Sequence, residues 1–258
     1  GPDRLERALK RASSTARRAF ASDDLYLERY VPDARHVEVQ VFGDGHGTLL
    51  HMYERECSVQ RRHQKLIEET PSPGLPEETR IAMTDAALTA AQGIGYEGAG
   101  TIEFLLAPDG EFYFLEANTR LQVEHGITEM TVGVDMVQQQ ISVASGARLG
   151  LSQAQIVPRG HAIECRIYAE DPETFLPSPG TITVWQMPRG DGVRVDTGLR
   201  LGDEVTPHFD PLLAKVMAWA ESRPEAIDKV AAALQRTRVE GVRTNIPFLL
   251  KALASPQF

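Results

Sequence analysis

Glu103 and Glu116 are the side chains of this sequence whose types and spacing best suit a metal ion. Each belongs to an apolar segment that predicts a β-strand, and the Pro-Asp-Gly sequence at residues 108–110 predicts a turn between the two segments. Antiparallel pairing in such a hairpin would bring the two carboxylates together on one face. Because like charges repel, a divalent cation with oxygen ligands from both carboxylates and from Asn118 would stabilise this arrangement. The alternative is that one of the two carboxylates faces solvent.

A dense polar stretch, residues 116–125, ends the second of these strands. The segment 111–115 is apolar and aromatic and predicts a buried strand, and seven polar or ionisable residues then fall within ten positions. Burying ions there costs several kcal/mol for each unless they pair or bind a metal, and ligands of open α/β sheets tend to bind at strand ends. We therefore expect a functional site here. The alternative interpretation is a charged loop at a solvated strand end.

A second polar segment, residues 54–69, is rich in arginine and also contains His63 and Lys65. It follows a predicted strand at residues 48–53. Basic side chains held in a cluster, inside an acidic protein, suit a bound anion such as phosphate or bicarbonate. An exposed run of charges is the alternative.

The composition limits the classes of partner and compartment. The 258 residues carry a net charge of −9, so there is no overall basic field to attract nucleic acid or an anionic membrane. No run of about eighteen apolar residues occurs, and the N-terminus has no signal-peptide core, so we expect a soluble, non-secreted protein. The two cysteines, Cys57 and Cys165, lack metal-ligand spacing, which indicates a reducing compartment.

The predicted elements change character near residue 150. An α/β half, residues 3–150, carries the carboxylates, and a β-rich half, residues 151–258, follows it. The helices are expected at 4–20, 76–94, 132–146, 224–238 and 246–253. The strands are expected at 24–31, 36–42, 48–53, 100–106, 111–116, 161–168, 180–187, 192–197 and 212–220.

Four segments together resemble one enzyme family. They are Glu56 to Lys65 (ECSVQRRHQK), Gly98 to Phe104 (GAGTIEF), Glu116 to His125 (EANTRLQVEH) and Glu164 to Pro172 (ECRIYAEDP). In order and spacing they resemble the biotin carboxylase component of biotin-dependent carboxylases, from about residue 23 to the end. The resemblance implies an α/β (α+β) fold: the C-terminal half of an ATP-grasp domain, with an antiparallel sheet and helices, followed by a β-rich biotin carboxylase C-terminal domain.

The resemblance also implies a reaction and its partners. The family uses ATP, Mg²⁺ or Mn²⁺ and bicarbonate to carboxylate N1′ of biotin through carboxyphosphate. The biotin is attached to a separate carrier subunit or domain, the product is used by a carboxyltransferase, and the full-length parent is expected to be a homodimer. No nucleic acid or membrane partner is expected. The compartment would be the cytoplasm, or the mitochondrial matrix in a eukaryote, and the final acceptor, an acyl-CoA, pyruvate or urea, is not identified.

Matching positions give the expected roles at the metal and anion sites. The metal ligands would be Glu103, Glu116 and Asn118, and the base that deprotonates bicarbonate would be Glu124. Arg120 would hold bicarbonate and the developing negative charge. Gln122 and the backbone of Val123 would complete that pocket, and Lys65 would hold the carboxyphosphate.

The nucleotide and biotin sites are expected on other segments. Near the nucleotide the resemblance implies Gln60 and His63, with His36 on the ribose side and with Glu28, Arg29 and Val31 on a strand that reads adenine. Arg166 would stabilise the biotin enolate, and Asp210 would be the carboxylate that positions it. Glu164, Glu170 and Asp171 are expected to be scaffold.

Three features depart from the family pattern. The N-terminal domain and the lid with its glycine-rich loop, which the family carries upstream, are not in these 258 residues, so we expect them to fold but to support little biotin-dependent ATP cleavage. Gly126 replaces the usual proline, which predicts a looser loop after Glu124. A biotinyl-lysine motif is absent, so the carrier is expected elsewhere.

Two other functions remain open from the sequence. One is a non-catalytic binding or interaction module that uses the same fold. The other is a different ATP-grasp ligase, of the carbamoyl-phosphate type, which shares the paired carboxylates and the asparagine. That second alternative does not explain the segment at residues 164–166 or the β-rich half.

Overall fold

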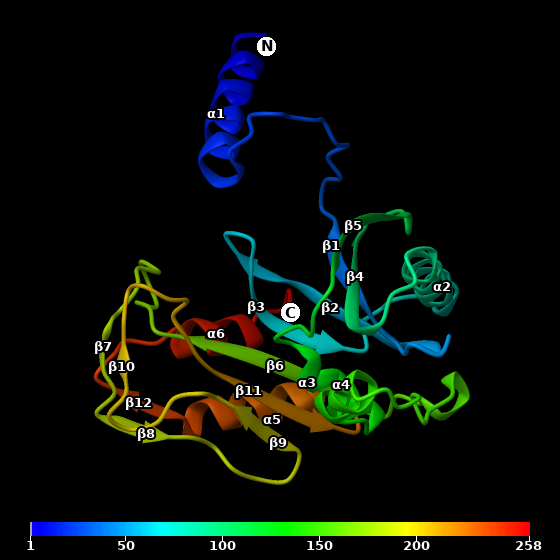
Figure 1. The fold of residues 1–258 in the computed structure, drawn as a ribbon. Coiled ribbons are helices and arrows are strands. Elements are labelled where there is room, and N and C mark those ends of the chain that lie inside the picture. The colour runs from blue at the N-terminus through cyan, green and yellow to red at the C-terminus, as the bar shows by residue number, and fades with distance from the viewer. Residues whose placement is uncertain (1) are drawn as a thin grey trace. The chain divides into compact units, whose positions relative to one another are not determined.

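The computed structural model describes residues 2–258, and the chain divides at Asp33 into two units that are taken separately. Residues up to Asp33 contain the helix α1 (Pro2–Phe20), which confirms the predicted amphipathic helix, followed by a loop (Figure 1). The remaining residues, 34–258, hold the other helices and every strand that the structure describes. The predicted site residues from His36 onward therefore share one unit.

One large antiparallel sheet runs through the second unit (Figure 1). Its eight strands lie in the order β5-β4-β1-β2-β3-β6-β11-β9. They are β1 (Arg35–Gly43), β2 (Leu49–Arg61), β3 (Gln64–Thr70), β4 (Gly98–Leu106), β5 (Phe112–Asn118), β6 (His161–Tyr168), β9 (Val193–Asp196) and β11 (Leu212–Ala220). Two ribbons of two strands complete the β-structure: β7 (Gly180–Thr181) with β10 (Glu204–Val205), and β8 (Val184–Gln186) with β12 (Arg238–Glu240).

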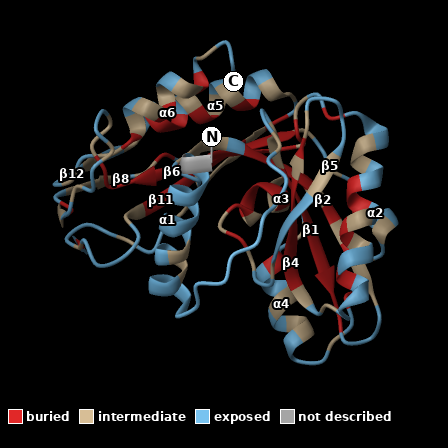
Figure 2. Ribbon diagram, turned by 90° about the horizontal axis from the view of Figure 1, so that it is seen from above, coloured by how far each residue is buried: buried red, intermediate tan, exposed pale blue. Residues whose placement is uncertain are grey.

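Alternation along β1 gives this part of the sheet one apolar and one polar face. Val37, Val39 and Val41 pack with residues of the helix α2 (Glu77–Gly93) in one core. Glu38 and Gln40 point the other way and are also fully buried. Figure 2 shows β1 and β2 in the colour of buried residues, with α2 alongside them. The polar face of β1 is therefore the place where buried charges must find partners.

A second core lies on the other half of the sheet. The helix α5 (Arg223–Arg236) packs on β6 and β11, and the helix α6 (Ile246–Leu253) packs against α5. Ile163, Cys165 and Val216 belong to this core. Because β3 pairs with β6, the sheet continues without a break across residue 150. The division into domains at residues 3–150 and 151–258 stays a prediction.

The predicted helix at 132–146 is too long: the helix in this region spans 136–144, and a separate helix that was not predicted precedes it. The helix α3 (His125–Val132) ends where Gly133 adopts a left-handed conformation with φ of 71°. The helix α4 (Met136–Ala144) then begins after Asp135, whose side chain accepts a hydrogen bond from the backbone N–H of Gln138. Apolar spacing extended the predicted helix back across this stop and start, and it missed α3.

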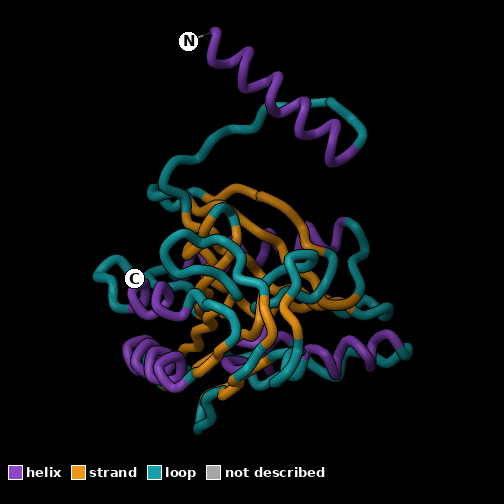
Figure 3. Tube along the Cα trace, turned by 90° about the vertical axis from the view of Figure 1, so that its left-hand side faces the viewer, coloured by secondary structure: helices purple, strands orange, loops and turns teal. Residues whose placement is uncertain are grey.

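The segment at 24–31 is a loop, so the predicted strand there is wrong (Figure 3). Its side chains alternate as in a strand, but no described strand pairs with its backbone, and a strand needs that partner.

The strand at 111–116 exists as β5, but it is an edge strand. Phe114 is 60% exposed and Leu115 38% exposed, so the predicted burial is wrong.

The polar segment 54–69 is mostly strand. It continues β2 to Arg61, turns at Arg62 and His63, which both have positive φ, and returns as β3. The strand predicted at 48–53 is therefore too short. Residues 54–57 and 66–69 are buried, so the exposed-run alternative fails. Within residues 2–258, each helix is too short or too polar to cross a lipid bilayer.

Candidate functional site

A cleft of about 870 Å³ lies on the polar face of the sheet and gathers most of the predicted site residues. Twelve of them line it: His36, Gln60, His63, Lys65, Glu103, Glu116, Asn118, Arg120, Gln122, Val123, Arg166 and Asp210. They come from segments more than 170 residues apart in sequence. Glu124 is fully buried and bonds two of the lining residues.

Glu124 sits at the start of α3, where the polar stretch of the sequence becomes helical. Its Oε1 accepts a hydrogen bond from Lys65 Nζ at 2.7 Å, and its Oε2 accepts one from Arg166 NH2 at 3.0 Å. The two cations come from β3 and β6, which are neighbouring strands. Helix α3 packs on both strands and fixes the carboxylate between the cations.

Lys65 contacts three carboxylates at once. Its ammonium group donates to Glu124, to Glu103 at 3.0 Å and to Glu38. Burial acts to lower the pKa of Lys65, but the surrounding negative charges outweigh burial and raise it well above its ordinary value. Lys65 therefore carries a full positive charge on the floor of the cleft.

A fully buried arginine, Arg55, also forms an ion pair with Glu38. Arg55 Nε donates to Glu38 Oε1 at 2.6 Å, and its NH1 donates to Gln40 and to Thr128 of α3 at 2.8 and 2.9 Å. Burial acts to raise the pKa of Glu38, but Arg55 and Lys65 lower it. No role was predicted for Arg55 or Glu38, although residues 36 and 38 of an alternating strand lie on the same face.

The two predicted metal carboxylates are direct neighbours across the β4–β5 ladder. Glu103 pairs with Glu116 in the register, which confirms the hairpin prediction. The Asn118 Nδ2 donates to Glu103 Oε1 at 2.9 Å and to Glu116 Oε1 at 3.1 Å. Carboxylate oxygens have the chemistry that Mg²⁺ and Mn²⁺ prefer. Glu116 is exposed, however, as the alternative interpretation expects for one of the two carboxylates, and Asn118 turns its amide nitrogen toward both.

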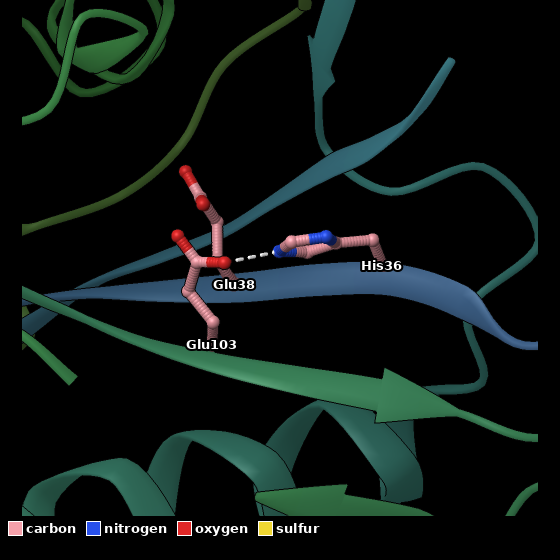
Figure 4. Close-up of side chains that lie close together, drawn as sticks. All are labelled: His36, Glu38 and Glu103. Atoms are coloured by element: carbon pink, nitrogen blue, oxygen red, sulfur yellow. Dashed lines mark ion pairs between the residues drawn. The ribbon is translucent and has the colours of Figure 1, made fainter. Parts of the chain in front are cut away.

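His36 on β1 also contacts this cluster. Figure 4 shows His36, Glu38 and Glu103 close together, with an ion pair joining His36 to Glu103; the His36 Nε2 lies 2.5 Å from Glu103 Oε2. Burial acts to raise the pKa of Glu103, but the hydrogen bond from His36 and the charge of Lys65 lower it to about 2. Glu103 is therefore ionised at neutral pH, as a metal ligand must be.

The predicted anion-binding residues line the outer part of the cleft. Arg120 is exposed and donates only weakly, to Leu121 O at 3.2 Å and to Asn118 Oδ1 at 3.4 Å. Gln122 is buried and donates to Glu103 Oε1 at 2.7 Å. The Arg120 guanidinium therefore keeps most of its donors available for a bound anion.

The nucleotide-side predictions have different outcomes. Gln60 Nε2 lies 2.9 Å from His36 Nδ1, and His63 is exposed in the turn between β2 and β3. Glu28, Arg29 and Val31 lie in the loop of the N-terminal unit, so their contact with adenine stays a prediction.

Arg166 has partners that the sequence analysis missed. Its Nε donates to Glu68 Oε1 at 2.5 Å, and NH2 donates to Glu124. Asp210, predicted to position this arginine, is exposed and accepts a hydrogen bond from Gln64 Nε2 at 3.3 Å. The role of Asp210 stays a prediction, while Glu68 and Glu124 are the carboxylates in direct contact with Arg166. Strict alternation from Lys65 would put Glu68 on the opposite face of β3, and a register shift between Lys65 and Ile67 breaks that alternation, so the pattern gave no signal of function.

The expected loosening after Glu124 is wrong. Gly126 lies in the first turn of α3 and is buried. A Cβ at this position would lie 2.4 Å from Met217 Sδ, so the methionine fills the space that a side chain would take. The segment is helical and packed, not a loose loop.

The amino-acid sequence matches two family models. Residues 1–152 match "Carbamoyl-phosphate synthase L chain, ATP binding domain", and residues 164–258 match "Biotin carboxylase C-terminal domain". "Biotin carboxylase 2" of Bacillus subtilis is 49% identical over 257 residues, which are 98% of this chain and 58% of the relative. "Biotin carboxylase" of a Nostoc species is 46% identical over 258 residues, 100% of this chain and 58% of the relative. The chain thus spans little more than half the length of these relatives.

Solved structures agree over the same residues. The biotin carboxylase-beta-gamma-ATP complex from Campylobacter jejuni superposes with a TM-score of 0.97 at 46% identity, covering 100% of this chain and 58% of that one. The biotin carboxylase domain dimer of the Hydrogenobacter thermophilus 2-oxoglutarate carboxylase, in complex with MgADP, ADP and bicarbonate, has a TM-score of 0.96 at 44% identity. Coverage there is 99% of this chain and 57% of that one. The ATP-grasp fold class is confirmed.

Proposed function

Because the chain belongs to the biotin carboxylase family, we propose that its cleft is the site where an ATP-dependent ligase carboxylates biotin. The observation that carries this proposal is the position of Glu124, whose two carboxylate oxygens are bonded by Lys65 and by Arg166. A base that takes a proton from bicarbonate needs cations beside it to stabilise the charge that develops. In this proposal Glu124 is that base, Lys65 holds the carboxyphosphate, and Arg166 faces the biotin.

The metal ion would bind at the β4–β5 hairpin. Glu103, Glu116 and Asn118 would hold Mg²⁺ or Mn²⁺, and the bound ion would neutralise charge on the phosphates of ATP. The direct pairing of the two glutamates in the register supports this assignment. Without a metal ion, Asn118 donates to both carboxylates and Lys65 donates to Glu103, which reduces the repulsion between the two glutamates.

Bicarbonate would bind between Arg120 and the metal-side residues. Arg120 presents a guanidinium group in the open part of the cleft, and Gln122 and the backbone of Val123 lie beside it in the lining. A planar guanidinium matches a planar carboxylate-like anion with two parallel hydrogen bonds. Bound bicarbonate would then lie within reach of the Glu124 base.

The nucleotide and the biotin would contact further residues. We infer that Gln60, His63 and His36 contact the nucleotide and that Glu28, Arg29 and Val31 read the adenine. Arg166 would stabilise the biotin enolate at N1′, with Asp210 at the rim of the cleft positioning that group. Residues 3–150 would supply the nucleotide, metal and bicarbonate side, and residues 151–258 the biotin side.

The partners follow from this chemistry. Biotin would arrive on a carrier subunit or domain, and a carboxyltransferase would pass the carboxyl group to an acyl-CoA, pyruvate or urea. The full-length protein would form a homodimer, like the biotin carboxylase domain of the Hydrogenobacter enzyme. The cytoplasm, or the mitochondrial matrix in a eukaryote, is the compartment that fits the relatives.

A carbamoyl-phosphate type of ligase is the second candidate, because residues 1–152 match the ATP-binding domain named for that enzyme. The match of residues 164–258 to the biotin carboxylase C-terminal domain favours biotin as the acceptor. A non-catalytic module would have no reason to keep Glu124 buried between two cations.

Nucleotide binding with and without metal tests the proposal. Isothermal calorimetry should show that ADP binds more tightly in the presence of Mg²⁺. In the double variant Glu103→Gln, Glu116→Gln, the Kd for ADP in Mg²⁺ should rise at least about tenfold, roughly 1.4 kcal/mol. Glu111→Gln, an exposed carboxylate in the turn before β5, is the matched control and should bind as the wild type does. Unchanged metal-dependent binding in the double variant would remove the metal assignment.

The 258 residues by themselves should cleave little ATP in the presence of bicarbonate and biotin, because the relatives and solved structures are longer. Phosphate positioning supplies much of the catalysis in phosphoryl transfer. A phosphate-release assay on these residues and on the intact enzyme compares the two rates. Equal rates would contradict this expectation.

A further inference from the structure

Two buried carboxylates to which the reaction chemistry above gives no role lie opposite each other on β3 and β6. Glu68 of β3 and Glu164 of β6 are directly opposite in the register, and both are fully buried. Side chains directly opposite in an antiparallel pair have Cβ atoms about 5 Å apart. Two ionised carboxylates at that separation in a dry environment would repel strongly.

The hydrogen bonds around the two carboxylates are unequal. Glu68 Oε1 accepts from Arg166 Nε at 2.5 Å, whereas Glu68 Oε2 and both oxygens of Glu164 accept from no residue that the structure describes. The nearest cation to Glu164 is Lys215, whose Nζ is 3.9 Å from Glu164 Oε2. That ammonium group already donates to Val123 O and lies 3.4 Å from Asp196.

The charges facing Glu164 do not neutralise it. They come from each element packed around it: Glu68 on β3, Arg166 on β6, Lys215 on β11, Asp196 on β9, and Glu124 and His125 at the start of α3. Arg166 is bonded to two other carboxylates, Glu68 and Glu124. An unpaired buried carboxylate is so unfavourable that such a group normally takes up a proton instead.

We propose that Glu164 holds a proton at neutral pH and donates it to Glu68, so that Glu68 acts as a positioning residue for Arg166. The protonated carboxyl has one O–H donor, and Glu68 Oε2 is an acceptor without a donor on the opposite strand. This bond satisfies both orphaned groups and orients the Glu68 carboxylate toward the guanidinium of Arg166. The part of the proposal that concerns biotin rests on the proposed function.

The titration behaviour agrees with this geometry. Burial raises the pKa of Glu164 well above its ordinary value. For Glu68, burial also raises the pKa, but the neighbouring charge of Arg166 acts to lower it. Glu164 is thus the member of the pair that keeps the proton, because Glu68 has the cation.

Infrared spectroscopy tests the proton directly and needs no enzyme activity. The C=O stretch of a protonated carboxyl group should persist at pH 7, where an ordinary glutamic acid with a pKa of about 4.3 is ionised. The band should disappear in Glu164→Gln and remain in Glu173→Gln, a matched change of an exposed carboxylate. Absence of the band in the wild-type protein, or its persistence in Glu164→Gln, would overturn the assignment of the proton.

The two isosteric variants also separate positioning from a merely structural role. Glu164→Gln replaces a neutral carboxyl by a neutral amide, so it should shift the Tm by less than about 2 °C and change kcat and the KM for biotin less than about threefold in the intact enzyme. Glu68→Gln removes the anion that orients Arg166, so it should cut biotin-dependent kcat/KM at least about tenfold. Bicarbonate-dependent ATP cleavage without biotin should change much less.

Equal losses in Glu68→Gln and Glu164→Gln, or a loss in Glu68→Gln that is the same with and without biotin, would overturn the positioning role. An enzyme without any biotin-dependent turnover would instead defeat the proposed function. The infrared band would still decide whether Glu164 holds the proton.

Discussion

Lys65 Nζ lies 2.7 Å from Glu124 Oε1, and this contact joins the lysine on the floor of the cleft to the carboxylate that we propose as the catalytic base. The same ammonium group also bonds Glu38 and Glu103, so one cation separates three buried carboxylates. Replacing it by a neutral group removes one cation from all three carboxylates and leaves each with its other ion-pair partner, Arg55, Arg166 or His36. Removing one partner of a buried ion pair costs about 3–5 kcal/mol. We predict that Lys65→Gln lowers bicarbonate-dependent ATP cleavage by at least about 100-fold and lowers the free energy of unfolding.

Steady-state kinetics and urea denaturation of the variant measure the two effects. Lys251→Gln changes an exposed lysine on α6 and should leave both quantities close to wild type. A Lys65→Gln enzyme that retained wild-type turnover would contradict the role of this lysine.

Arg55 should matter more for stability than any exposed arginine. Its guanidinium group is fully buried and bonds Glu38, Gln40, Thr101 and Thr128. Arg55→Met leaves the buried Glu38 with Lys65 as its remaining cation, so we expect a loss of about 3–5 kcal/mol in the free energy of unfolding. Equilibrium denaturation in urea measures the loss.

The matched control is Arg238→Met. Arg238 pairs with Glu240 on the surface and is 64% exposed at its side chain, so its removal should cost less than about 1 kcal/mol. Similar losses in the two variants would show that the buried network around Arg55 contributes little.

Much of the fold could be predicted from local patterns. Alternation identified β1, β-rich composition identified β6 and β11, and the Pro-Asp-Gly turn identified the β4–β5 hairpin that pairs Glu103 with Glu116. These elements have strong local signals because their side chains meet one apolar and one polar environment in turn. The predictions fail where the pairing between strands determines the structure. The segment 24–31 alternates but has no described partner strand, and β5 is apolar but lies at the edge of the sheet.

The inner part of the site depends on contacts that no local pattern contains. Arg55 and Glu68 look like ordinary charges of a polar segment, and only the pairing of β1 with β2 and of β3 with β6 makes them partners of Glu38 and Glu164. Register between distant strands is set by the whole sheet. The resemblance supplied the residues that face the ligands, while the residues that hold them required the structure.

Gly126 and Met217 should show a coupled effect on stability. Ala has a higher helix propensity than Gly by about 1 kcal/mol, but its Cβ at position 126 would lie 2.4 Å from Met217 Sδ. Overpacking of this kind costs about 1–3 kcal/mol, so we predict that Gly126→Ala is destabilising. Combining it with Met217→Ala should give a favourable coupling of about 0.5–3 kcal/mol, measured by urea denaturation of the four proteins in the cycle.

Gly93→Ala in α2 is the control for helix propensity, because no atom lies within 4 Å of the Cβ that it would add. That change should be neutral or stabilising. Additive effects of Gly126→Ala and Met217→Ala would mean that the methionine does not fill the space beside the glycine.

Asp44 should make the stability of the β1–β2 turn depend on acid pH. Its carboxylate accepts hydrogen bonds from the backbone N–H groups of His46, Thr48 and Leu149 at 2.9, 2.8 and 2.9 Å. Burial acts to raise its pKa, but these three bonds lower it from 3.8 to about 2. We predict that Asp44→Ala lowers the free energy of unfolding by about 1–3 kcal/mol at pH 7, because buried donors lose their acceptor.

The sign of the pH effect follows from the lowered pKa. A carboxylate with a pKa that is lower in the folded state stabilises the protein fully above its unfolded pKa near 3.8, and this stabilisation is lost as the pH falls toward 2. The difference between wild type and Asp44→Ala should therefore shrink between pH 4 and pH 2 in urea denaturation. Asp109→Ala, which removes a single bond to Glu111 N in an exposed turn, should show a smaller difference. A difference for Asp44→Ala that stayed constant with pH would mean that the charge of this carboxylate does not stabilise the turn.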